Sequence, residues 1–166
     1  MEGYLLETEQ YVRQTLLNGL HGRGSHVNPA NVFENLNWRL VGELQNGIEH
    51  SIWQIVHHMN YWQEFSLALL RNDIPITPEH AADTWTDNVS PTSESEWLQT
   101  VNTFLKGLHA IEGFMSDLDI TVAARQERSR AEVIGMLVGH NSYHLGQIVF
   151  LRQIFGAWEP SLGDTW

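Results

Sequence analysis

The sequence contains no cysteine and few basic residues, and these two features exclude several classes of function. Without cysteine there is no disulfide scaffold, no thiolate zinc site and no cysteine nucleophile. The 166 residues include 20 acidic and 9 basic ones, so the formal net charge is −11 with histidine neutral. Binding to nucleic acid or to an anionic membrane surface requires a basic patch, so neither kind of partner is expected.

Long apolar runs are also missing from the sequence. No stretch approaches the ~20 residues that a transmembrane helix needs. The N-terminal segment MEGYLLETEQ carries acidic residues where a signal peptide would carry lysine or arginine. Together with the lack of cysteine, this favours a cytoplasmic protein. The length predicts one domain, over residues 1–166.

Hydrophobic residues recur with helical spacing in four long stretches, and no stretch alternates as a β-strand would. The first helix is expected over Tyr4–Leu20, because Gly22 and Gly24 follow it as stop signals. The connection that comes next has room for a short helix within Asn31–Leu44. A second long helix is expected to begin at Ile48 or Ser51 and to end at Arg71.

The second half of the chain contains a long loop and two further helices. The loop, Asn72–Pro91, carries an isolated tryptophan, Trp85; a connection this long is functional or packs over something. The third helix is expected to begin near Ser90 and Pro91 and to continue through Met115. The fourth is expected over 129–155, with Ser129 and Glu132 forming a capping box. These elements predict an all-α four-helix bundle with long connections.

Two histidines lie on the core-facing side of the fourth helix. His140 and His144 are four residues apart, so both imidazoles can reach one metal ion. A polar residue inside a bundle costs free energy unless it is paired or coordinated. The seam that contains them is apolar at both ends and polar in the middle: Val133, Leu137, His140, His144, Gln147, Leu151 and Ile154.

The second helix carries a pair of adjacent histidines, His57 and His58, and helical phase distinguishes them. His58 lies on a mostly apolar seam, whereas His57 shares its face with the polar Asn60 and Glu64. We therefore predict that His58 points inward with His140 and His144, and keep His57 as the alternative ligand. Three imidazoles from two helices would leave coordination positions open for water or substrate.

The remaining polar residues near this seam are assigned simpler roles. Gln147 is expected to hydrogen-bond a ligand or a histidine, and Asn141 and Tyr143 are expected to pack or cap. Arg152 is expected at the surface or in an interface rather than beside a substrate. The other histidines are expected to be exposed or to act as caps; these are His21, His26, His50, His80 and His109.

Two segments of the sequence resemble one known family. HSIWQIVHHMNYWQEF (50–65) and GHNSYHLGQIVFLRQ (139–153) are similar to the DinB/YfiT-like family of metal-dependent enzymes. The resemblance extends over nearly the whole chain, in helix number, helix order and loop length. It implies a bundle whose metal ligands correspond to His58, His140 and His144, with zinc or nickel as the ion and a homodimer as the assembly. Some relatives transfer low-molecular-weight thiols, and one is a mycothiol-dependent isomerase.

Three functions follow from these observations. The first is a divalent-metal enzyme that transfers a low-molecular-weight thiol to a small electrophile or hydrolyses a small molecule. The second is a non-catalytic, metal-stabilised dimeric bundle that binds a partner or small ligand. That function requires a fourth metal ligand, for which the long loop offers His80 or Asp83. The third is a metal-free bundle with histidines in a polar core.

Overall fold

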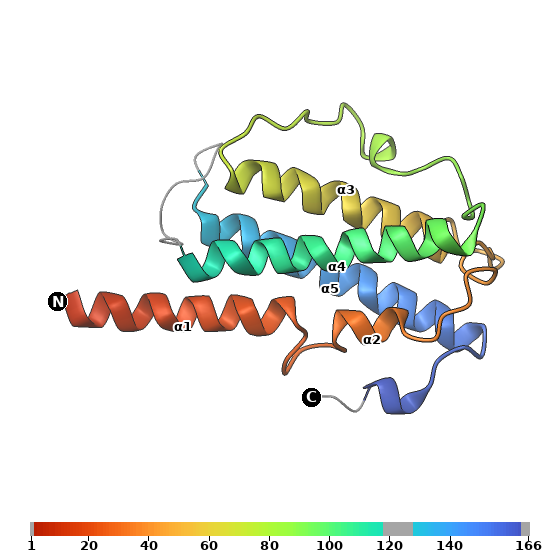
Figure 1. The fold of residues 1–166 in the computed structure, drawn as a ribbon, viewed down its shortest axis with the longest axis horizontal. Helices are drawn as coiled ribbons and strands as arrows, with labels where there is room; N and C mark the ends of the chain where they lie inside the picture. Colours follow the sequence, from red (N-terminus) through yellow and green to blue (C-terminus); the bar gives the residue numbers. More distant parts are fainter. Residues whose placement is uncertain (1, 118–127, 164–166) are drawn as a thin grey trace.

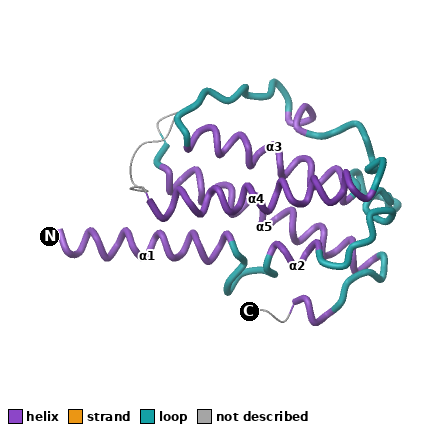
Figure 2. Tube along the Cα trace, viewed as in Figure 1, coloured by secondary structure: helices purple, strands orange, loops and turns teal. Residues whose placement is uncertain are grey.

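The fold is all-helical, as the sequence predicts. In the computed structural model of the chain, residues 2–117 and 128–163 are described, and no β-strand occurs within these ranges. Figures 1 and 2 show the helices and the loops that connect them. The elements in chain order are α1 (Glu2–Leu20), α2 (Pro29–Phe33), α3 (Ile52–Leu70), the 3-10 turn η1 (Ala81–Thr84), α4 (Glu94–Asp117), α5 (Arg130–Ile154) and the 3-10 turn η2 (Pro160–Gly163).

Four long helices form the bundle. Helix α3 packs against both α4 and α5, and α1 packs against α5 and α4. The loop between α3 and α4 runs along the outer side of α3 (Figure 1), and its turn η1 contacts that helix. None of the described helices combines the length and apolar character that a membrane span requires. The core draws on all four long helices and includes Leu20, Trp53, Met59, Phe104, Ile111, Ile134 and Ile148.

The helix boundaries are set by local capping interactions. Helix α5 begins with the expected capping box: the Glu132 amide donates to Ser129 Oγ over 3.2 Å, and the Ser129 amide donates to Glu132 Oε2 over 2.6 Å. Helix α4 begins at Glu94, so the expected start at Ser90 and Pro91 is wrong. The reason is a later cap, because the Glu96 amide donates to Ser93 Oγ over 3.2 Å.

Helix α2 is short and lies earlier than expected. It spans Pro29–Phe33, and Asn28 caps it by accepting a hydrogen bond from the Ala30 amide. The range predicted for a short helix, Asn31–Leu44, therefore overlaps only its last three residues. Beyond Phe33 the chain continues as turns, and Asn35 adopts a left-handed backbone conformation with φ of 56°. That conformation does not continue a right-handed helix.

Arg152 is buried inside the fold, so the surface or interface position expected for it is wrong. Its side chain is 0% exposed. Nη1 donates to the carbonyl oxygen of Val32 over 2.7 Å, and Nη2 donates to those of Glu34 and Ala157 over 2.9 and 2.7 Å. The guanidinium thus joins the end of α5 to the end of α2 and to the C-terminal segment. It satisfies one buried carbonyl group, that of Val32, and the partly buried ones of Glu34 and Ala157.

Candidate metal centre

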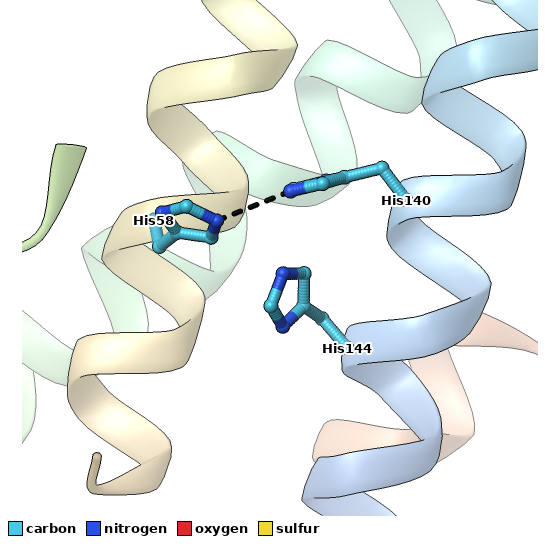
Figure 3. A group of neighbouring side chains, drawn as sticks. All are labelled: His58, His140 and His144. Carbon is cyan, nitrogen blue, oxygen red and sulfur yellow. Dashed lines mark hydrogen bonds between the residues drawn. The ribbon is translucent and has the colours of Figure 1, made fainter. Parts of the chain in front are cut away.

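Three histidines meet between α3 and α5. His58 projects from the second turn of α3, and His140 and His144 project from successive turns of α5 (Figure 3). One ring nitrogen from each residue lies within 4.8 Å of the others. His140 Nε2 and His58 Nε2 are 3.2 Å apart. His58 and His144 are buried and His140 is half-buried. The structure therefore brings together the three residues that the sequence singled out.

The spacing of these nitrogens fits a bound metal ion. A tetrahedral ion with metal–nitrogen bonds of about 2.0–2.1 Å holds its ligand nitrogens about 3.3 Å apart. The separation between the Nε2 atoms of His58 and His140, 3.2 Å, is close to that value. The three-histidine group, whose ligand atoms all lie within 4.8 Å of one another, could thus hold a metal ion. Among the described residues, no fourth histidine or carboxylate joins the group.

Hydrogen bonds orient two of the three rings. Thr84 Oγ1 donates to the carbonyl oxygen of Ala81 over 2.7 Å, so it accepts from Nδ1–H of His58 over 2.8 Å. His144 Nδ1 lies 2.7 Å from Gln147 Oε1, which can only accept. Both rings therefore carry their proton on Nδ1 and turn the lone pair of Nε2 inward. This is the tautomer in which Nε2 binds a metal.

The loop between α3 and α4 holds Thr84 in place through the start of α3. Ser51 Oγ donates to the carbonyl oxygen of Val89 over 2.6 Å, and Gln54 Nε2 donates to that of Thr86 over 3.0 Å. The same two side chains form the capping box of α3. The cap that begins the helix thus also fixes the loop that orients His58. The loop packs over the site, one of the two roles that its length and isolated tryptophan predicted.

Trp85 stacks directly on the site and brings in a further histidine, His50. The Trp85 ring is parallel to that of His58 at 3.9 Å and to that of His50 at 3.7 Å. Two rings on one face of an indole could not both lie so near its centre without clashing, so His50 and His58 stack on opposite faces. His50 is therefore not the simple exposed or capping residue that was expected. The isolated tryptophan was the only sequence signal for this arrangement, and nothing in the sequence indicated Thr84.

The neighbouring residues separate into those that join the site and those that do not. His57 lies against Trp53, with ring centroids 4.2 Å apart, and is not part of the three-histidine group. Gln147 bonds to His144, one of its two expected roles, and its amide donates to Tyr143 Oη over 3.2 Å. Asn141 is buried, as a packing residue should be.

The possible fourth ligands from the long loop do not reach the histidines. His80 and Asp83 are both exposed, and Asp83 Oδ2 accepts a hydrogen bond from the His80 amide over 2.8 Å. Asp83 therefore caps η1 instead of approaching the site. His21 and His109 both lie beside Glu112 at the surface, at 3.4 and 3.2 Å. His26 faces the carbonyl oxygens of Gly19 and Val27 at the end of α1.

Burial keeps the three imidazoles neutral. Burial first, and then the proximity of His144, lowers the pKa of His140 and of His58 to about 4. Burial also lowers the pKa of His144. At pH 7 all three rings are therefore neutral, and His58 and His144 present an unprotonated Nε2 to a cation.

These pKa values predict how the metal-free protein responds to acid. Between pH 6.5 and about 4, the unfolded histidines bind protons that the folded ones do not, so the unfolded state gains stability. In chelator-treated protein we therefore expect the free energy of unfolding to fall as the pH decreases through this window. Urea unfolding at pH 7 and pH 5 measures the change. The double variant His58→Gln/His140→Gln should show a smaller pH dependence; an unchanged dependence would contradict the assignment.

A cavity of about 250 Å³ adjoins His140, one of the three histidines. It lies between α3 and α5, and His140 forms part of its wall. Trp62 also borders both the cavity and the site, with its ring 6.4 Å from that of His58 and 6.3 Å from that of His140. The site thus faces a space that a small molecule could enter, with no fourth side chain of the described residues closing it.

The fold and the site define an all-helical bundle with a three-histidine group between two of its long helices. A family model for the DinB superfamily matches residues 6–148. Because this match covers most of the 166 residues, the chain belongs to the DinB superfamily. The matched range contains all three histidines, and the family resemblance noted in the sequence is confirmed. Searches of curated proteins and of solved structures found no match to the chain.

Proposed function

We propose that the protein is a divalent-metal-dependent enzyme whose ion, zinc or nickel, is held by His58, His140 and His144. The observation that carries this proposal is the convergence of three neutral imidazoles beside a cavity, without a fourth ligand among the described residues. A structural zinc site is closed by four protein ligands, whereas a catalytic one keeps a position open. This favours an enzyme over a non-catalytic, metal-stabilised bundle.

The proposed reaction is the transfer of a low-molecular-weight thiol to a small electrophile, with hydrolysis of a small molecule as the alternative. When bound, a divalent cation would act as a Lewis acid and lower the pKa of a thiol or water that coordinates to it. In the transfer, a carbon–sulfur bond forms, the leaving group departs with its electron pair, and the thiol proton passes to solvent. The chain contributes ligand orientation through Thr84 and Gln147, and aromatic walls through Trp62 and Trp85 that limit access of water.

Elemental analysis of untagged protein tests the metal site, because an affinity tag would itself bind metal. We expect about one zinc or nickel ion per chain. The variant His140→Ala, purified in parallel, should contain little or none, because two imidazoles bind a divalent cation much more weakly than three. Loaded protein would then be screened with thiols and electrophiles, and after that with esters. If neither protein retains metal after incubation with zinc or nickel, the proposal is wrong.

We further propose that the protein is a cytoplasmic homodimer. Tyr143, Phe150 and Ile154 are spaced by seven and four residues, so they share one face of α5, and they are 64%, 56% and 44% exposed. An exposed line of apolar residues on one helix is stabilised by packing against the same line of a second copy. Sedimentation velocity should therefore give a dimer for the wild type and a monomer for Phe150→Asp. A monomeric wild type would contradict the proposal.

A further inference from the structure

We propose that the cavity beside His140 binds the apolar body of a small substrate that carries one negatively charged group at its far end. This inference rests on the proposed function, because it names the substrate class of the same site. The inference is drawn from the volume and the lining residues of the cavity. The type of reaction does not determine either of these.

The walls of the cavity are almost entirely carbon. Helix α3 contributes Trp62, Phe65 and Leu69, and α5 contributes Val133 and Leu137. Burying an apolar group against such walls is favourable, whereas a polar group would lose its water without gaining a partner. The walls therefore select an apolar substrate body.

The volume indicates how large a group the cavity can enclose. An engineered apolar cavity of about 150 Å³ is known to accept a single benzene ring. The present cavity, at about 250 Å³, has room for one ring and a short chain. It is smaller than the sites of drug-sized ligands, which begin near 300 Å³. We therefore expect a substrate with one aromatic ring or a comparable aliphatic group.

The two ends of the cavity differ chemically. His140 lies at one end, and Arg128, which precedes α5, lies at the other. The Arg128 guanidinium contacts Met136, which precedes His140 by four residues on α5, or about 6 Å along the helix axis. Arg128 is the only residue with a permanent charge among the described residues that line the cavity.

The environment of Arg128 leaves it suitable for an anion. Its Nη1 contacts Met136 Sδ at 3.4 Å, and its charge lies near Glu132. The Glu132 carboxylate already accepts hydrogen bonds from the amide and hydroxyl groups of Ser129, over 2.6 and 2.9 Å. A guanidinium at the mouth of an apolar cavity is well suited to a carboxylate. The reacting end of the substrate would then lie at His140.

Direct binding to metal-free protein tests the inference independently of activity. The probes are 3-phenylpropanoate and its uncharged analogue 3-phenylpropanol, measured by calorimetry with chelator-treated wild-type protein. We expect both to bind, and the acid to bind about threefold to tenfold more tightly than the alcohol. Arg128→Gln should remove that preference while both probes still bind. Equal affinities in the wild type would overturn the assignment of Arg128, and absence of binding would overturn the inference.

Filling the cavity provides a second test with a matched control. Ser66 lines the cavity on α3, whereas Ser95 is exposed on α4. Ser66→Phe should weaken both probes by about tenfold or more, and Ser95→Phe should leave their affinities unchanged. If Ser66→Phe does not fold, the smaller Ser66→Leu replaces it. Equal binding by the filled variant and the control would overturn the inference.

The outcomes separate this inference from the proposed metal site. Metal uptake without probe binding would contradict the substrate class and leave the metal site intact. Probe binding to a protein that takes up no metal would support the cavity assignment and contradict the proposed enzyme. Calorimetry therefore tests the substrate class, elemental analysis tests the metal site, and either proposal can be contradicted without the other.

Discussion

Replacement of His58 by alanine should weaken zinc or nickel binding by more than about 100-fold, because even a residue that only orients a metal ligand can contribute tenfold to 100-fold. His58 supplies one of the three converging nitrogens, and its Nε2 lies 3.2 Å from that of His140. Calorimetric titration of chelator-treated, untagged protein measures the loss. The same variant should lose the rise in unfolding temperature that saturating metal gives to the wild type.

The matched control for this experiment is a substitution of the adjacent residue, His57. His57→Ala should bind metal with nearly wild-type affinity, because His57 packs against Trp53 and stands outside the three-histidine group. Comparison of the two variants shows which of the adjacent histidines, His57 or His58, is the metal ligand. If His57→Ala abolished binding and His58→Ala did not, the assignment of the ligand on α3 would be reversed.

Replacement of Arg152 by methionine should destabilise the protein by about 3–5 kcal/mol, with no direct effect on the histidine site. Methionine retains much of the side-chain volume but removes every donor to the carbonyl groups of Val32, Glu34 and Ala157. Each carbonyl left buried without a partner costs about 1–3 kcal/mol. Urea unfolding at pH 7 measures the loss. Arg152→Lys should recover only part of it, since an ammonium group cannot reproduce the planar fork.

A surface arginine provides the comparison. Arg71 makes one ion pair with Glu64, at 2.9 Å, and its side chain is 43% exposed. Arg71→Met should therefore change the free energy of unfolding by less than about 1 kcal/mol, as is usual for exposed pairs. If the two substitutions had similar effects, the role assigned to Arg152 in joining α5 to α2 would be wrong.

Periodicity and capping chemistry within single helices were sufficient to predict much of this protein. The four long helices followed from apolar spacing, and the start of α5 followed from Ser129 and Glu132, whose mutual hydrogen bonds lie within four consecutive residues. Helical phase also selected His58 over His57 for the inward position, because an angle around one helix axis depends only on sequence spacing. The convergence of His58 with His140 and His144 then required only that α3 and α5 be neighbours.

Other features depended on contacts between segments far apart in the chain, which spacing does not encode. The hydrogen bond from Thr84 and the stacking of Trp85 and His50 arise because the long loop is fastened to the start of α3. Arg152 looked like a surface residue because its partners are backbone carbonyls, which carry no side-chain signature. Spacing along the chain was therefore enough to predict the four long helices and the candidate ligands. The residues that orient those ligands, and the cavity beside His140, could not be predicted in this way, because both result from the packing of separate segments.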